Sequence, residues 1–448
     1  MSLTDHLRGK LEKAPPIIIV LLSSISAFSI YVCTYGFRKG FAANTYSGQS
    51  FWGVDYKIWL VIAQIFGYAL SKFIGVRFIA EVKRHQRLPR ILALILVAWI
   101  SLLGLALLPA PWGILCLFIN GIPLGLIWGL IYSYLEGRRN TELMGAILCT
   151  SFIFAAGLIK SIGQFFLTVL HVAENWMPFA VGALFFIPLL FFTFLLDLTP
   201  PPDEKDQQSR MIRLPMYAAQ RKAFLMRFWP GIIFNVCLYV ALTVMRDMRD
   251  YFEIEIWRSL VPGKLPAFLY TQIDAPVSIC ILVLMSLMIY VKNNLRAFQL
   301  AHLSIMMGFL VIGGTALLYY FHSISAYQLM YAVAFGLYLS YVPYSLFFFD
   351  RLIALFRVKG NVGFLIYFAD SIGYSGSVLI MLYKQFGPEK LSWGNFFIHS
   401  LTIVSIIGIL CIILSYRYFK NLYSVQKDTP ATSSPQIEMR NTIIIEGI

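Results

Sequence analysis

Long apolar runs recur along almost the whole chain, and short polar segments separate them. Each run has roughly 18 to 25 residues, the length that an α-helix needs to cross the hydrocarbon core of a bilayer. A transmembrane β-barrel would show shorter segments of alternating polarity. The pattern therefore predicts an all-α integral membrane protein with twelve spans, at residues 15–41, 56–79, 91–108, 112–135, 143–170, 177–198, 228–250, 275–291, 295–320, 326–349, 362–383 and 393–418.

Short motifs return half a chain apart in nearly constant register. A tyrosine–valine pair precedes Arg38 by seven residues, and another precedes Arg246 by the same spacing. The segment KSIG at 160–163 returns as DSIG at 370–373, and a weaker echo joins the Tyr-Ser pairs at 132 and 344. A shared offset indicates two structural repeats of about six helices each, related by pseudo-two-fold symmetry.

A polar, proline-rich stretch separates the two repeats at 199–210, and a basic segment with interleaved apolar residues follows at 211–227. We expect this basic segment to form an amphipathic helix on the inner membrane surface. The architecture resembles the major facilitator superfamily (MFS) fold. The predicted parts are an N-terminal six-helix bundle at 1–198, a cytoplasmic linker at 199–227, a C-terminal six-helix bundle at 228–419 and a disordered cytoplasmic tail at 420–448.

Composition excludes an ordinary soluble enzyme, because hydrophobic residues make up 59% of the 448 positions, charged residues only 13%, and the mean hydropathy is +0.73. The net charge of +14 is concentrated in every second loop, as the positive-inside rule requires. Both termini should therefore lie in the cytoplasm, in a plasma membrane or a bacterial inner membrane. We do not expect nucleic-acid binding.

Recognised catalytic motifs are absent from the sequence, so we expect no enzymatic activity. The six cysteines lie inside apolar runs without close CxxC spacing, which is typical of small core residues. We therefore expect neither a metal site nor a cofactor. Without a nucleotide-binding motif, any transport would be driven by a gradient or by exchange.

Two arginines occupy matching places in the repeats, Arg38 in the first apolar run and Arg246 in the seventh. In a two-repeat transporter these helices face each other across the central site. A guanidinium offers forked donors that suit phosphate or carboxylate. We predict that both arginines bind an anionic substrate, with Arg249 a rival for the second position. The alternative is that they reach to the membrane interface.

Other polar side chains inside the runs extend the predicted site. Lys160 and Asp370 stand in the middle of the fifth and eleventh runs, where an ionised side chain is usually functional. We predict that they form a cross-repeat charge pair, acting as a latch or in proton coupling; a purely structural ion pair is the alternative. The further candidate substrate ligands are Lys72, Lys160, Tyr35, Tyr239 and Asn120.

Residues 35–41 (YGFRKGF) resemble the Y-x-x-R-K-x-F motif of the organophosphate:phosphate antiporter family, and 67–75 (GYALSKFIG) resemble its second-helix motif. Shorter likenesses occur at 120–121 and 235–239. The resemblance implies that Arg38 grips phosphate and that Lys72 lines the same cavity. In that family the other arginine stands where this chain has Thr243, one turn before Arg246.

These observations predict a secondary active transporter of a small organic anion, either an organic phosphate or a sugar acid. It would work by alternating access with exchange or proton coupling, as a monomer whose partners are the solute and the lipid bilayer. The alternative is a transporter-like membrane sensor that binds an anion and signals without transport.

Overall fold

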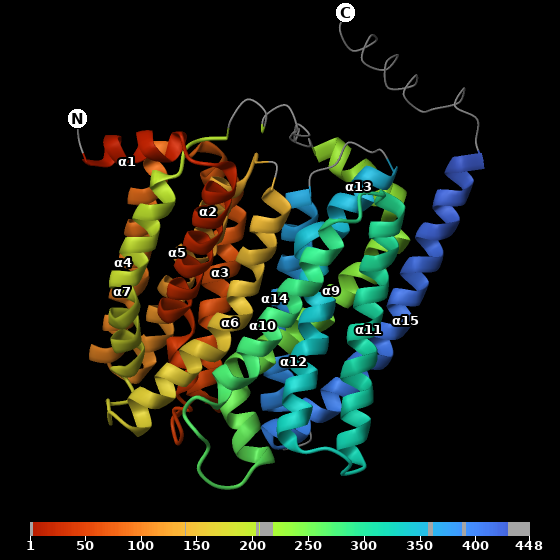
Figure 1. The fold of residues 1–448 in the computed structure, drawn as a ribbon. Coiled ribbons are helices and arrows are strands. Elements are labelled where there is room, and N and C mark those ends of the chain that lie inside the picture. Colours follow the sequence, from red (N-terminus) through yellow and green to blue (C-terminus); the bar gives the residue numbers. More distant parts are fainter. Residues whose placement is uncertain are drawn as a thin grey trace, which may run out of the picture.

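The computed structural model describes residues 3–138, 140–202, 206, 218–356, 362–387 and 391–428, and its helices run side by side between two ends of the molecule (Figure 1). In chain order, the helices are α1 (Leu3–Glu12), α2 (Pro16–Lys39), the 3-10 turn η1 (Gly40–Ala43), α3 (Tyr56–Glu81), α4 (Arg84–Leu107), α5 (Ala110–Leu135), α6 (Thr141–Thr168), α7 (Met177–Leu198), α9 (Ala218–Leu260), α10 (Leu269–Ile289), α11 (Asn294–Tyr320), α12 (Ala326–Pro343), the π-turn η2 (Tyr344–Phe348), α13 (Phe349–Phe356), α14 (Val362–Phe386) and α15 (Trp393–Asp428).

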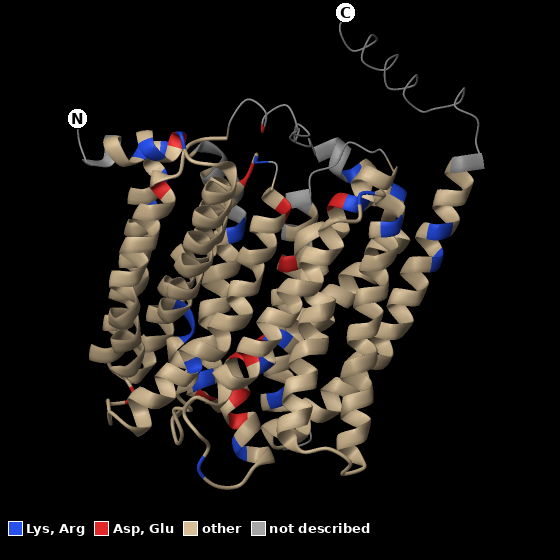
Figure 2. Cartoon of the chain, in the orientation of Figure 1, with Lys and Arg blue, Asp and Glu red and all other residues tan. Residues whose placement is uncertain are grey.

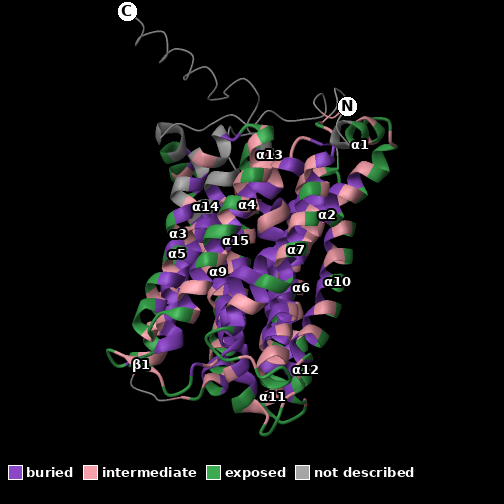
Figure 3. Ribbon diagram, turned by 90° about the vertical axis from the view of Figure 1, so that its left-hand side faces the viewer, coloured by how far each residue is buried: buried purple, intermediate pink, exposed green. Residues whose placement is uncertain are grey.

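Ten helices of the described residues are long and apolar enough to cross a membrane, so the chain is a multi-pass membrane protein. α3 and α14 are not among the ten, although they are 26 and 25 residues long. Twelve spans therefore stay a prediction. Buried positions face the interior of the helical assembly (Figure 3), and exposed apolar side chains such as Ile100, Ile187 and Leu410 cover its outside, as a lipid-facing surface requires.

Helices α2–α7, here called the first half, pack mainly among themselves, and so do α9–α15, the second half (Figure 1). The halves meet where α6 packs on α10 and where α3 packs on α14. α1 and the last turns of α15 lie at the same end of the molecule. The predicted division into two six-helix domains stays a prediction. A hairpin of two short strands, β1 (Ser50–Phe51) and β2 (Val54–Asp55), lies at the opposite end (Figure 3).

The seventh helix is longer than the sequence pattern predicted. α9 begins at Ala218, so the described part of the expected amphipathic segment 211–227 belongs to it, whereas 211–217 lie outside the described residues. α9 also continues past residue 250 to Leu260, across a kink at Phe252. α15 reaches Asp428, which makes the first part of the expected disordered tail helical; residues 429–448 lie outside the described ones.

Glycines let α3 and α5 approach closely beneath the site. A Cβ atom at Gly67 would lie 2.1 Å from the carbonyl oxygen of Phe118, and one at Gly121 would lie 2.3 Å from that of Gln64. Small residues permit such backbone contact between membrane helices. This contact fixes the part of α3 that carries Gln64 and Tyr68, and Tyr68 lines the central cavity described below.

Candidate functional site

A central cavity lies between the two halves and has a volume of about 680 Å³, including space open to solvent. Its walls come from α2, α3, α5 and α6 of the first half and from α9, α12, η2 and α14 of the second. The basic residues that line it are Arg38, Lys39, Lys72 and Arg246, and the acidic ones are Asp247, Asp250 and Asp370. Six tyrosines share the lining: Tyr31, Tyr35, Tyr68, Tyr239, Tyr341 and Tyr374.

Arg38 is the cavity-lining cation that has no acidic partner among the residues that the structure describes. Only 8% of the residue is exposed, and its guanidinium carbon lies 4.1 Å from the centre of the Tyr68 ring and 5.6 Å from that of Tyr35. Its Nε atom has no hydrogen-bond partner, and no carboxylate among the described residues forms an ion pair with it. The ring faces attract the cation without neutralising it.

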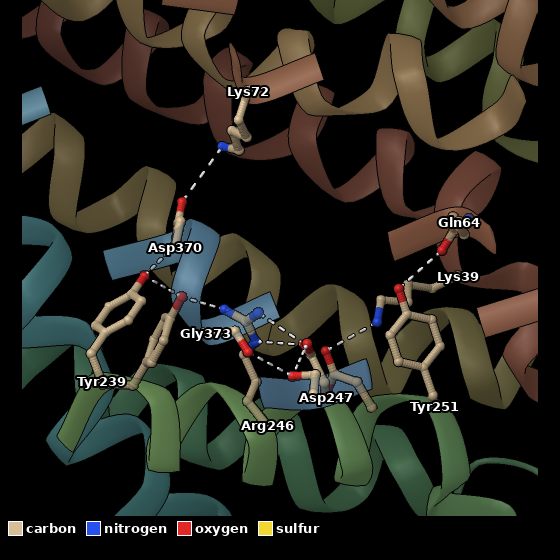
Figure 4. Close-up of polar contacts among 12 residues, drawn as sticks. Lys39, Gln64, Lys72, Tyr239, Arg246, Asp247, Tyr251, Asp370 and Gly373 are labelled. Atoms are coloured by element: carbon tan, nitrogen blue, oxygen red, sulfur yellow. Dashed lines mark hydrogen bonds and ion pairs between the residues drawn. The ribbon is translucent and has the colours of Figure 1, made fainter. Parts of the chain in front are cut away.

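Arg246, by contrast, is paired within its own helix. Its Nη2 atom lies 2.9 Å from Oδ1 of Asp247, and its Nη1 donates to the hydroxyl of Tyr341 (Figure 4). Oδ2 of Asp247 accepts a further hydrogen bond of 2.8 Å from Ser377. The two arginines thus line one cavity, as the sequence predicted, but only Arg38 carries an uncompensated charge.

Asp370 pairs with Lys72, which corrects the predicted Lys160–Asp370 pair. Lys72 Nζ lies 3.8 Å from Oδ2 of Asp370, and Oδ1 accepts a 2.5 Å hydrogen bond from Tyr239 (Figure 4). The physical reason is helix packing: α14 lies against α3, which carries Lys72, whereas α6, which carries Lys160, packs on α10. Lys72, Asp370, Tyr35 and Tyr239 all line the cavity.

Lys160 belongs to a separate group of buried charges, named here the ion-pair cluster and made of Lys160, Arg249, Glu253 and Asp274. Lys160 pairs with Glu253. Nη2 of Arg249 lies 3.3 Å from Oε1 of Glu253 and 2.5 Å from Oδ1 of Asp274. All four residues are at most 1% exposed, and none lines the cavity. Of the two rivals for the second arginine, Arg246 is thus the one at the cavity.

Two further ion pairs join the halves near the cluster. Nζ of Lys39 lies 3.6 Å from Oδ2 of Asp250, and Nζ of Lys57 lies 2.6 Å from Oε1 of Glu255. In both, as in the Lys160–Glu253 and Lys72–Asp370 pairs, the lysine comes from the first half and the carboxylate from the second. Figure 2 shows a group of acidic and basic positions in the part of the molecule away from α1, apart from the basic positions that gather around α1 and α13.

Asn120 lies outside the cavity lining, which corrects its prediction as a substrate ligand. Its Nδ2 donates to the carbonyl oxygens of Ala98, at 2.9 Å, and Phe37, at 3.2 Å. Its Oδ1 accepts a 2.7 Å bond from Gln64, whose own Oε1 accepts from Tyr251 across the halves (Figure 4). With these partners Asn120 ties α2, α3 and α4 together instead of facing a solute.

Several charged residues near the cavity were not predicted as functional from the sequence: Lys39, Lys57, Glu253 and Asp274, which are buried, and Glu255, which is partly buried. Two of the acids follow the predicted end of the seventh span, and Lys57 and Asp274 adjoin span ends. A signal was present: charges recur at 246, 247, 249, 250, 253 and 255, a spacing that places several on one helical face. In the described part of the chain no group of three metal-ligating side chains is suited to hold a metal ion.

Residues 40–422 match a family of unknown function, DUF5690. The chain belongs to this family. No curated protein matches it. Among solved structures, it is similar to a D-xylose–proton symporter at a TM-score of 0.59 and 15% identity, over 89% of this chain and 97% of that one.

Two further solved structures extend this similarity. One is the inward-open xylose transporter XylE from E. coli, with a TM-score of 0.55 and 14% identity over 90% of this chain and 96% of that one. The other is the MFS proton:xylose symporter XylE bound to 6-bromo-6-deoxy-D-glucose, with a TM-score of 0.55 and 15% identity over 89% and 95%. The DUF5690 chain therefore has the MFS fold. Its place within the organophosphate antiporter branch stays a prediction.

Proposed function

We propose that this protein is a secondary transporter of a small organic anion, either a sugar acid or an organic phosphate, and that Arg38 is its principal anion ligand. The observation that carries the proposal is the uncompensated guanidinium in the central cavity. A charge that is buried without a counter-ion is costly, so a site that keeps one is suited to a ligand that supplies the opposite charge. Lys72 and Arg246 extend the positive field around it.

The way in which the halves meet supports the proposal of alternating access. Near the ion-pair cluster, lysines of the first half bind carboxylates of the second, so that end is held together by charge. Rocking the halves apart there would break these pairs while the cavity walls stay with their own half. We place the opposite end, with its basic residues Arg84, Arg87 and Arg351, in the cytoplasm, as the positive-inside rule predicts.

The experiment is uptake into proteoliposomes that contain the purified protein. The probes are radiolabelled D-glucuronate and D-glucose 6-phosphate as anions, and D-xylose as the neutral solute of the structural neighbours. The wild type should take up at least one anion in a saturable manner, and Arg38→Gln should lose that uptake. Losing one charge-assisted contact costs about 1.5–3 kcal/mol, or about 10- to 150-fold in affinity.

The matched control is Arg296→Gln, which removes the same charge from an exposed position at the start of α11. Its uptake should equal that of the wild type. Uptake of xylose alone, or anion uptake that survives in Arg38→Gln, would contradict the proposal. Anion binding without flux would instead support the sensor.

A further inference from the structure

Among the described residues, the charges that line the cavity and those of the cross-half pairs and the ion-pair cluster balance except for one. Apart from Arg38, every cation lining the cavity or belonging to the cross-half pairs and the ion-pair cluster has an acidic partner among the described residues. The pairs are Lys39 with Asp250, Lys57 with Glu255, Lys72 with Asp370, Arg246 with Asp247, and Lys160 and Arg249 with Glu253 and Asp274. Seven cations therefore face six carboxylates, and one positive charge is left over.

Because the unpaired positive charge is that of Arg38, in the cavity wall, it determines how much negative charge a ligand can carry there without remaining unbalanced. Only 8% of Arg38 is exposed, so a singly charged anion that binds there neutralises it and leaves these charges balanced. A doubly charged anion leaves one negative charge without a counter-ion, unless it breaks an existing pair or binds with a proton. Charge balance therefore favours a monoanion over a dianion at the same position.

Tyrosine hydroxyls around Arg38 indicate what the remainder of the ligand carries. Tyr68 and Tyr35 lie next to the guanidinium, and the Tyr374 ring centre is 5.4 Å from that of Tyr68. No described residue hydrogen-bonds the hydroxyls of Tyr31, Tyr35, Tyr68 or Tyr374, whereas Tyr239 is bonded to Asp370. A hydroxyl can both donate and accept, so this group is suited to a ligand with several hydroxyl groups.

We propose that the central cavity selects a hydroxylated monocarboxylate, such as a sugar acid, and discriminates against the dianion of a sugar phosphate. The inference rests on the proposed function, because it narrows the substrate class of that same site. Arg38 binds the carboxylate, the tyrosines bind hydroxyl groups, and the acidic residues of the cavity set the limit of one negative charge.

The test compares ligands that share a carbon skeleton and differ in charge. D-Glucuronate with D-glucose 6-phosphate is one pair, and glycerate with glycerol 3-phosphate is the other. Dissociation constants of the purified protein are measured by isothermal titration at pH 8 and pH 6. At pH 8 the phosphate of each pair should bind at least about tenfold more weakly than the carboxylate, because the phosphate is a dianion at that pH.

The pH dependence gives an internal check on this comparison. A phosphate ester has its second pKa near 6, so its monoanion rises from about 1% at pH 8 to about 50% at pH 6. The affinity for the phosphate should accordingly rise by up to about 50-fold over this range, while a carboxylate stays singly charged throughout.

Two variants change the charge count directly. Asp370→Asn and Asp247→Asn each remove one carboxylate and raise the surplus to two positive charges. Each should increase the affinity for glucose 6-phosphate relative to glucuronate at pH 8 by about tenfold. Using two positions on different helices guards against one variant that fails to fold. Glu142→Gln removes an exposed carboxylate, paired with Arg351 outside the cavity, and should leave the ratio unchanged.

The possible results test the charge limit separately from anion binding at Arg38. If the wild type binds glucose 6-phosphate as tightly as glucuronate at pH 8, or if both Asp variants leave the ratio unchanged, the charge limit is overturned while anion binding stands. If no anion binds, or if Arg38→Gln binds glucuronate as the wild type does, the proposed function itself falls.

Discussion

The central cavity and the ion-pair cluster both bury a guanidinium among helices of the two halves, yet they treat it differently. Arg249 in the cluster is fully buried and contacts two carboxylates, Glu253 and Asp274. Arg38 in the cavity contacts two tyrosine rings and no described carboxylate. The first region pairs its charges internally, and its Lys160–Glu253 pair joins the two halves. The second leaves one positive charge without an acidic partner among the described residues.

This difference separates structural charges from binding charges inside one membrane protein. Removing a member of a closed network strands its partners in a poorly solvated place, which destabilises the fold. Removing a cation that has no acidic partner leaves no carboxylate without a counter-ion. Stability and ligand binding should therefore respond in opposite ways in the two regions, and the following variants test this from the largest expected effect to the smallest.

Glu253→Gln should cause the greatest loss of stability. It leaves Lys160 and Arg249 without their shared carboxylate, and breaking a buried pair costs about 3–5 kcal/mol. The melting temperature of the purified protein in detergent, measured by differential scanning fluorimetry, should fall clearly. A melting temperature equal to that of the wild type would show that the cluster does not hold the halves together.

Arg38→Gln should have the opposite profile. Anion affinity should fall by about 1.5–3 kcal/mol because a charge-assisted contact is lost. The melting temperature without ligand should stay the same or rise, since an uncompensated buried charge has been removed. Titration calorimetry with glucuronate gives the first quantity and fluorimetry the second. A strong drop in melting temperature would place Arg38 among the structural charges.

Lys57→Met tests a pair at the edge of the cluster. The Lys57 side chain is 3% exposed, but that of its partner Glu255 is 15% exposed and keeps access to water. The loss of stability should therefore be intermediate, about 2 kcal/mol, between the costs of buried and exposed pairs. A loss as large as that of Glu253→Gln, measured side by side, would mean that water does not relieve Glu255.

Glu142→Gln should have the smallest effect. Its carboxylate lies 3.5 Å from Arg351, and its side chain is 51% exposed. Exposed pairs contribute about 0–1 kcal/mol, and salt screens them further. The free energy of unfolding should fall by no more than this amount at moderate salt, so the melting temperature should stay close to that of the wild type. A larger drop would indicate that this pair also holds the halves together.

The sequence predicted the regular parts of this fold because its signals were strong. Long apolar runs indicated the helices, and the shared register of Arg38 with Arg246 indicated that both belong to one site. Both do line the central cavity. The end of the seventh helix was harder, because the charges at 247–255 interrupt the hydrophobic pattern, and only the packed structure shows that ion pairs with the first half satisfy them.

Partners across the halves could not be predicted from sequence. The repeat paired Lys160 with Asp370 by symmetry, but symmetry relates positions and does not make them neighbours. Asp370 pairs with Lys72 because α14 packs on α3. Lys160, on α6, pairs instead with Glu253 of α9. Asn120 likewise looked like a ligand in the sequence, yet three helices use its hydrogen bonds.

A structure of the protein determined with D-glucuronate bound tests the central claim most directly. We expect density for the sugar acid in the central cavity, with its carboxylate within hydrogen-bonding distance of the Arg38 guanidinium and its hydroxyl groups among the tyrosines. A ligand bound elsewhere, or one in the cavity whose carboxylate avoids Arg38, would contradict that claim.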